Sequence, residues 1–208
     1  MNPPSRLAKL RPGDLAPEQR ELYAAIVGGP RAHGPQLFAL TDDEGALEGP
    51  FNAMLLSPGI GGSLQDLGRE IRYASSLTDR AREIAILVVA QQWDSDFERH
   101  AHRAVGRSVG LTEAELSALA CGDDPQFADP MEQLVLDTTW SLVAHADLDD
   151  ATYAGAVAGL GEATLFELST LVGYYATLAL QLRLFRVPAP ARHEDPGASG
   201  VDAASITA

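Results

Sequence analysis

The feature that most constrains the fold of this chain is an unbroken apolar run from Ile84 to Ala90. A helix turns by about 100° per residue, so seven consecutive apolar residues cover every face of it. Such a helix needs apolar neighbours on all sides and therefore belongs in the middle of the molecule. Thr78 stands where an N-cap residue would begin this helix, which we expect to span Asp79 to Trp93.

Apolar residues recur at helical spacing along most of the chain, and no alternating run is bounded by hairpin residues. The sequence therefore predicts an all-α fold of about seven to nine helices. A capping box at Thr112 and Glu115 begins one of them. The other expected helices span residues 17–27, 51–56, 60–75, 79–93, 97–109, 130–146, 150–159 and 164–185.

The chain length favours one domain followed by a tail. A chain of 208 residues can bury a single good core, which we place in residues 1–187. After Val187 the sequence is rich in Pro, Ala, Gly and Ser without any period, so residues 188–208 are predicted to be disordered. The single Cys121 excludes an internal disulfide, and no apolar run of signal-peptide length begins the chain. We therefore expect a cytoplasmic location.

Charge and hydropathy exclude two kinds of partner. The 15 Lys and Arg residues stand against 29 Asp and Glu, and a net charge of -14 repels phosphate backbones. Nucleic acid is therefore not an expected partner. The longest uncharged apolar stretch, Leu168 to Leu182, is shorter than the roughly 20 residues that span a bilayer. It predicts a buried helix and no membrane association.

The residues that bear chemistry gather in one helix and in the start of the helix before it. Ser95, Glu98 and His102 are spaced by three and four residues, so they share one helix face. A carboxylate one turn before an imidazole can orient the ring and raise its basicity, as general acid/base catalysis requires. Glu83, at the start of the apolar helix, adds a second carboxylate.

Other interpretations of these residues stay open. A Glu and His pair at this spacing is common on solvated helix faces, and Glu83 could simply complement the helix dipole or pair with an arginine. His100 lies about 200° around the helix from His102, so the two rings do not share a metal, and no metal site is expected. Tyr174 and Tyr175 either pack in the core or line a site.

Four blocks of the sequence occur in the order typical of one known family. They are LTDDEGALEGPFNAMLLSP, LTDRAREIAILVVAQQWDSDFERHAH, FADPMEQLV and LVGYYATLALQLRLFRVP. In this order the chain resembles the carboxymuconolactone decarboxylase family from roughly Leu15 to Pro188. The family includes the alkylhydroperoxidase D group, whose redox motif runs Glu, eleven residues, Cys, two residues, Cys, three residues, His. On this chain the motif begins at Glu83 and ends at His102.

The two cysteine positions of that motif are occupied by Ser95 and Glu98. Neither side chain can serve as the thiolate nucleophile or the resolving thiol, so thiol peroxidase activity is not expected. The resemblance instead implies a cofactor-independent acid/base enzyme acting on a small lactone or related carboxylic acid by decarboxylation, isomerisation or hydrolysis. In this hypothesis His102 delivers a proton and Glu98 orients His102. Glu83 takes part in the proton transfer directly or through water.

The resemblance also suggests binding residues and an assembly. Ser95, Arg80, Arg82 and Arg183 are candidates for substrate binding, since an arginine can hold a carboxylate with two hydrogen bonds. Members of the family are typically trimers or hexamers, so we expect a homo-oligomer. The alternative is a non-catalytic helical binding or assembly protein in which the Glu and His side chains merely join helices.

Overall fold

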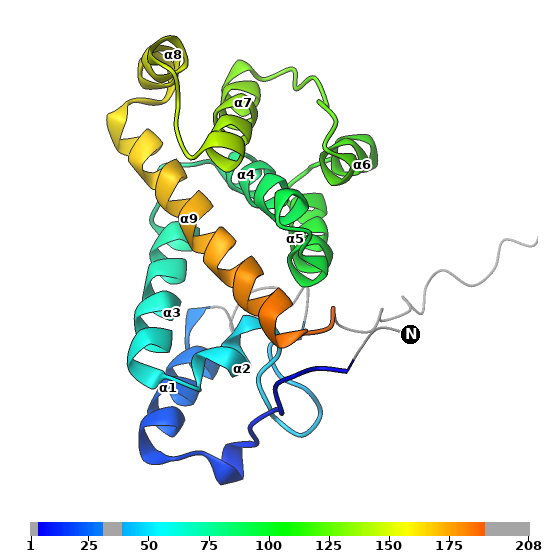
Figure 1. Ribbon diagram of the computed structural model, residues 1–208, viewed down its shortest axis with the longest axis vertical. Helices are drawn as coiled ribbons and strands as arrows, with labels where there is room; N and C mark the ends of the chain where they lie inside the picture. Colours follow the sequence, from blue (N-terminus) through cyan, green and yellow to red (C-terminus); the bar gives the residue numbers. More distant parts are fainter. Residues whose placement is uncertain (1–3, 31–38, 190–208) are drawn as a thin grey trace, which may run out of the picture.

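The computed structural model describes residues 4–30 and 39–189, and in that part of the chain it contains nine α-helices and no strand (Figure 1). The prediction of an all-α fold is confirmed. A short 3-10 helix, η1, precedes them at Pro12–Asp14. The helices are α1 (Pro17–Val27), α2 (Pro50–Met54), α3 (Pro58–Tyr73), α4 (Asp79–Gln92), α5 (Asp96–Ser108), α6 (Glu113–Cys121), α7 (Pro130–His145), α8 (Asp150–Leu160) and α9 (Glu162–Phe185).

Local signals in the sequence set the helix ends. Pro17, Pro50, Pro58 and Pro130 each open a helix, where the N–H that proline lacks would have no helical partner. The capping box predicted before α6 is present. No predicted helix end differs from the observed one by more than two residues, and η1 was not predicted. The predicted disordered tail lies outside the described residues from residue 190 onward.

Helix α4 is the centre of the molecule, as its apolar run predicted. All ten residues from Ala81 to Ala90 are buried. The helix packs against α5, α6, α7 and α9, so each of its faces meets another helix. The hydroxyl of Thr78 accepts a hydrogen bond from the backbone N–H of Ala81 at 3.2 Å and caps the helix as expected.

Helix α9 crosses the molecule diagonally, with α1 to α3 toward one end and α6 to α8 toward the other (Figure 1). Its inner face, which includes Leu168, Leu171 and Ala179, is fully buried. Its outer face is apolar as well, because Phe166 and Leu180 are 71% and 53% exposed. The stretch predicted to be a buried helix is therefore buried on one side only.

Helix α9 is also the one described helix that is long and apolar enough to cross a membrane by length and composition. The core helix of a soluble protein passes the same test, and the inner face of α9 lies in the core. This criterion therefore gives only weak evidence for a membrane.

Candidate acid–base site

The site forms where the chain reverses between α4 and α5. Helix α4 ends at Gln92, Asp94 adopts a positive φ of 50°, and α5 begins at Asp96. The reversal packs α5 back against α4. Glu83 and His102, which are 19 residues apart, thereby become neighbours. Two helices and one tight turn are enough to assemble the acid/base residues.

His102 lies between two carboxylates. Its Nδ1 is 2.7 Å from Oε2 of Glu83, and its Nε2 is 3.3 Å from Oε2 of Glu98. All three side chains are buried, with residue exposures of 0% for Glu83, 3% for Glu98 and 5% for His102. The sequence placed these three residues together, and the structure brings them into one hydrogen-bonded array.

The two carboxylates control the charge of the imidazole. Burial disfavours the protonated ring, but the charge of Glu83 and the hydrogen bonds from both carboxylates outweigh it and raise the pKa of His102 to about 9. At neutral pH the ring is therefore an imidazolium whose two N–H groups each donate toward a carboxylate. The interpretation of Glu98 and His102 as a solvated surface pair does not fit this burial.

Two buried oxygens beside this array have no hydrogen-bond partner in the described part of the chain. They are Oε1 of Glu83 and Oγ of Ser95. An unsatisfied buried polar atom costs about 1–3 kcal/mol, so such atoms are rare and call for a reason. Ser95 is also the N-cap of α5, but its hydroxyl makes no capping bond. Neither Glu83 nor Ser95 lines the pocket described below.

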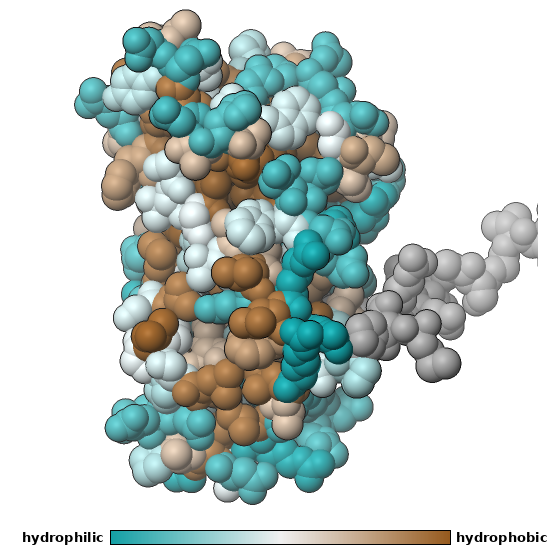
Figure 2. Space-filling model, viewed as in Figure 1, coloured by the Kyte–Doolittle hydropathy of each residue, from teal (hydrophilic) through white to brown (hydrophobic). Residues whose placement is uncertain are grey.

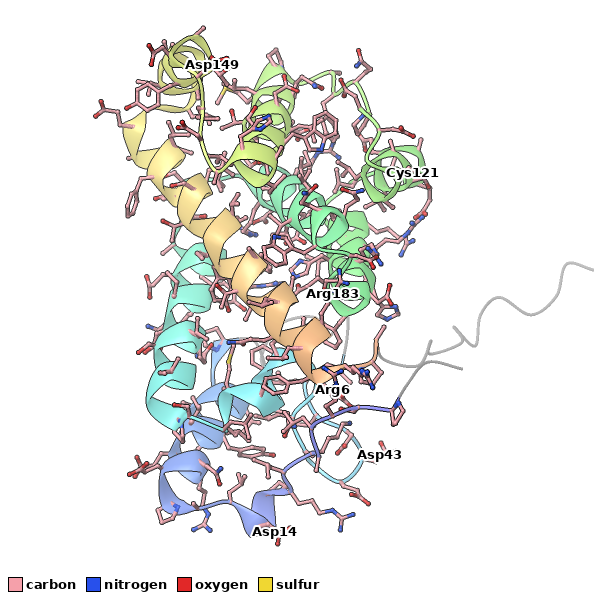
Figure 3. All side chains as sticks on the ribbon, viewed as in Figure 1. Arg6, Asp14, Asp43, Cys121, Asp149 and Arg183 are labelled. Carbon is pink, nitrogen blue, oxygen red and sulfur yellow. The ribbon has the colours of Figure 1, made fainter. Side chains whose placement is uncertain are left out.

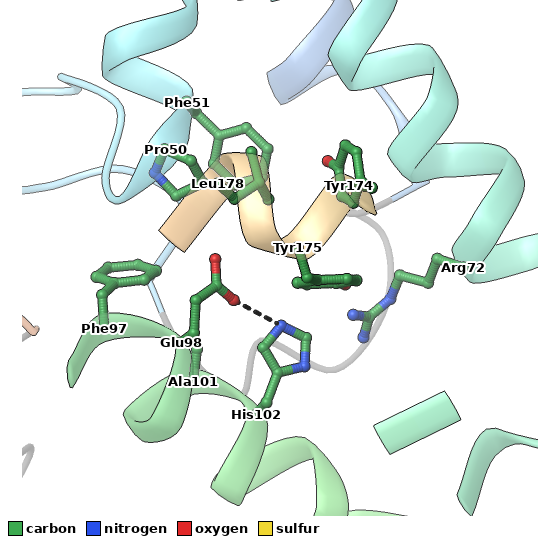
Figure 4. A pocket seen from close by; sticks show the side chains of 10 residues that line it. All are labelled: Pro50, Phe51, Arg72, Phe97, Glu98, Ala101, His102, Tyr174, Tyr175 and Leu178. Atoms are coloured by element: carbon green, nitrogen blue, oxygen red, sulfur yellow. Dashed lines mark ion pairs between the residues drawn. The ribbon is translucent and has the colours of Figure 1, made fainter. Parts of the chain in front are cut away.

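A pocket opens on one side of the array. It is small and partly open to solvent. Helices α2, α3, α5 and α9 supply its walls (Figure 4). The lining residues are Pro50, Phe51, Arg72, Phe97, Glu98, Ala101, His102, Tyr174, Tyr175 and Leu178. Glu98 and His102 face the pocket, whereas Glu83 does not line it.

Aromatic rings hold the wall opposite α5. The rings of His102 and Tyr175 meet edge to face with centroids 5.1 Å apart, and those of Tyr174 and Tyr175 do so at 5.2 Å. Both tyrosines are buried and line the pocket. The question that the sequence left open is answered, because these two residues belong both to the core and to the site.

A glycine permits the close packing at the edge of the pocket. Gly49 has a φ of 59°, and a Cβ atom at this position would collide with the ring of Phe97. Only glycine adopts this conformation easily and leaves room for the ring. Gly49 is the residue before Pro50, so the same position also sets the start of α2.

The arginines predicted to bind substrate lie elsewhere. Arg80 donates to Glu132 at 2.7 and 2.9 Å and to Glu115 at 3.0 Å. These bonds, with that to Glu132 the strongest, raise the pKa of Arg80. The arginine thus joins α4 to α6 and α7. The guanidinium of Arg82 forms an ion pair with Asp79 at 2.5 Å.

Arg183 is also outside the pocket. Its Nη1 donates to the backbone oxygen of Trp93 at 2.6 Å, and its side chain is 53% exposed (Figure 3). The structure brings none of the three predicted arginines to the pocket wall. Sequence reasoning placed Arg80 and Arg82 near the site because they precede Glu83 on the same helix, but successive side chains of a helix point to different neighbours.

Arg72 is the arginine that lines the pocket, and no sequence pattern pointed to it. It lies near the end of α3, which joins the site only through tertiary packing. Pro50 and Phe51 were missed for the same reason. No spacing rule connects these residues to the α5 motif, so no signal within one sequence could have found them.

Comparisons with known proteins bear on the fold. No family model and no curated protein matches this chain. A peroxidase-related protein from Ralstonia eutropha, described as an alkylhydroperoxidase AhpD core, superposes with a TM-score of 0.70 at 12% identity, covering 91% of this chain and 94% of that one. A peroxidase-related protein from a Silicibacter species gives 0.69 at 15% identity, covering 90% and 93%.

A third solved structure agrees with these two. A protein of unknown function from Agrobacterium tumefaciens, suggested to be an antioxidant defence protein AhpD, gives a TM-score of 0.61 at 16% identity, covering 70% of this chain and all of that one. The chain therefore has the AhpD-like all-α fold. Within that fold its site is a buried Glu–His–Glu array without a cysteine. Its place in the carboxymuconolactone decarboxylase branch stays a prediction.

Proposed function

We propose that this protein is a cofactor-independent acid/base enzyme that acts on a small lactone or related carboxylic acid. The observation that carries the proposal is the buried array of Glu83, His102 and Glu98, of which Glu98 and His102 line a small pocket. A proton donor and a proton acceptor side by side in a largely apolar pocket are the minimum that proton transfer at carbon requires.

The geometry supports a different division of roles from the one expected. Glu83 is behind the ring and holds Nδ1, so it orients His102 and stabilises the imidazolium. Glu98 is at the pocket, and in Figure 4 one of its oxygens faces His102 while the other points away from it. In our proposal Glu98 exchanges the proton with the substrate carbon. The positive charge of the His102 imidazolium, which is held between the two carboxylates, stabilises the oxygen on which negative charge develops.

Three reactions fit this division of roles. In a decarboxylation the bond between the ring and the carboxyl carbon breaks, carbon dioxide leaves, and the electron pair spreads toward the lactone carbonyl. The carbon then takes up a proton that Glu98 relays from His102. An isomerisation removes and returns a proton at different carbons, and a hydrolysis needs a base for water. In each case an imidazolium beside the developing oxyanion lowers the barrier.

Thiol peroxidase chemistry is not part of this proposal, although two of the structural neighbours are named peroxidase-related. Ser95 and Glu98 stand where the family motif has its cysteines, and neither can form a disulfide. The single cysteine, Cys121, is exposed at the end of α6 and does not line the pocket (Figure 3).

We also propose that the protein acts in the cytoplasm as a homo-oligomer, a trimer or a hexamer. The support is the exposed apolar side chains of α3 and α9, among them Ile60 and Phe166 at 66% and 71% exposure. Figure 2 shows apolar residues gathered over the side of the molecule that α9 crosses. Light scattering coupled to gel filtration measures the assembly, and a monomer at micromolar concentration would refute this part of the proposal.

The test of the activity is a screen of purified protein against lactone acids. Carbon dioxide release, loss of the lactone carbonyl band and proton exchange at carbon separate the three reactions. We expect His102→Gln and Glu98→Gln to lower turnover by about a hundredfold or more while circular dichroism stays unchanged. Full turnover by folded His102→Gln protein would overturn the acid/base assignment, whereas no turnover of any lactone acid by the wild type would favour a non-catalytic binding or assembly protein.

A further inference from the structure

Arg72 carries an inference about what the pocket binds. The residue is half-buried, lines the pocket and makes no hydrogen bond or ion pair with any residue in the described ranges. Its guanidinium lies over the ring of Tyr73, with 5.9 Å from Cζ to the ring centroid. Arg69, one turn earlier on α3, instead pairs with Asp66 and Glu70 at 3.1 Å each.

The direction of the side chain adds to this contrast. In Figure 4 the guanidinium of Arg72 points toward the rings of Tyr175 and His102, on the side away from Glu98. The cation and the catalytic carboxylate thus stand at opposite ends of the pocket. In Figure 4 the rings of Tyr175 and His102 lie between them. This arrangement suits a molecule with an anionic group at one end and a carbon skeleton beside the proton-transfer pair.

We propose that Arg72 binds a carboxylate of the substrate, an inference that rests on the proposed function and deepens it. A guanidinium offers two parallel N–H donors that match a carboxylate, and a partly desolvated site strengthens the pair. Arg72 thereby takes the role that the sequence suggested for Arg80, Arg82 or Arg183. It selects ionised acids over their neutral esters and sets the distance of the skeleton from Glu98.

The proposal also limits the chemistry at the bound carboxylate. Carbon dioxide is neutral, so an ion pair with Arg72 stabilises the carboxylate that it holds and opposes its departure. The carboxylate on Arg72 therefore serves to bind the substrate and is not the group that leaves. Any bond that breaks lies nearer Glu98 and His102.

The experiment measures binding instead of turnover. The probe is γ-butyrolactone-γ-carboxylate, a five-membered lactone acid, with its methyl ester as the uncharged counterpart, and calorimetry gives the affinity of each. We expect Arg72→Met to weaken binding of the acid by roughly tenfold or more and to leave the ester unchanged. Arg72→Lys should retain part of the affinity, and Arg69→Met, on the same helix, should retain all of it.

The outcomes separate this inference from the proposed function. Equal affinity of the wild type and Arg72→Met for the acid, an equal loss for acid and ester, or no binding of the acid by the wild type would each overturn the role of Arg72. The same measurements in the His102→Gln background need no turnover. If they still show dependence on Arg72 while His102 proves dispensable for catalysis, the carboxylate site stands and the proposed function fails.

Discussion

The carboxylate of Glu83 lies 2.7 Å from Nδ1 of His102, and both groups are buried. The other nitrogen of the ring faces Glu98, so one imidazole is held between two acids from two helices. Such an array is costly to bury unless every charge is compensated. Its proton can be shared among three groups, which makes the titration of His102 the most direct measure of the site.

We expect His102 to titrate near pH 9 in the folded protein. Glu83 makes the largest contribution that raises this pKa, so Glu83→Gln should lower it strongly, while burial continues to favour the neutral ring. Nuclear magnetic resonance of the ring nitrogens follows both titrations. An unchanged His102 pKa in the variant would contradict the assigned geometry.

The raised pKa of His102 also predicts how the stability of the folded protein depends on pH. The pKa of His102 is raised from 6.5 to about 9 on folding, so the folded state binds this proton more tightly than the unfolded state. The resulting stabilisation is complete below pH 6.5, fades above it and is lost once the pH passes about 9. The free energy of unfolding should fall by up to about 3 kcal/mol across this window.

Urea denaturation between pH 6 and 10 measures this dependence. The His102→Gln variant is the control, because it lacks the titrating ring and should show a flatter profile over the same range. If both proteins lost stability in parallel, the dependence would arise from another group.

We expect Arg80 to stabilise the fold and to take no part in substrate binding. Its removal leaves the buried carboxylate of Glu132 without its main partner, and Arg80→Met should lower the free energy of unfolding by about 2–3 kcal/mol. Denaturant unfolding is the measurement. Arg103→Met, which breaks a surface pair with Glu113, is the matched control and should cost much less. Loss of turnover without loss of stability in Arg80→Met would return this arginine to the substrate site.

Gly49 should be essential to the shape of the pocket. Gly49→Ala combines a strained positive φ with a collision against Phe97, and we expect a loss of about 1–3 kcal/mol in the free energy of unfolding. The melting temperature should fall. The affinity for the lactone-acid probe should fall as well, because the displaced ring of Phe97 lines the pocket. Gly155→Ala, in α8 where a Cβ meets nothing within 4 Å, should be neutral or stabilising. Equal stability of the two variants would contradict this account.

Most of the fold could be predicted because its signals are local. The bounds of α1 matched the structure at both ends, since Pro17 opens the helix and Gly28 follows its last residue. The apolar run of α4 predicted a buried central helix, because a helix without a polar face has no side to turn to water. Only the short helix η1 was not predicted, since a three-residue turn leaves no periodic pattern in the sequence.

The site was only half predictable. The spacing of Glu83, Glu98 and His102 matched a family motif, and the helices that carry them pack together as that motif implies. The arginine could not be chosen, because Arg80 and Arg82 are near in sequence while Arg72 is near only in space. The roles of the two glutamates also depended on which of them faces the pocket.

The amino-acid sequence alone predicted the helices, the central position of α4 and the candidate acid/base residues, because hydrogen bonds, caps and helical periods act within a few residues. The pocket, its arginine and the charge of His102 follow from tertiary structure alone. Each depends on distances between side chains of separate helices, and those distances exist only after α3, α5 and α9 have packed around a common core. Burial then gives the electrostatic interactions at His102 their strength.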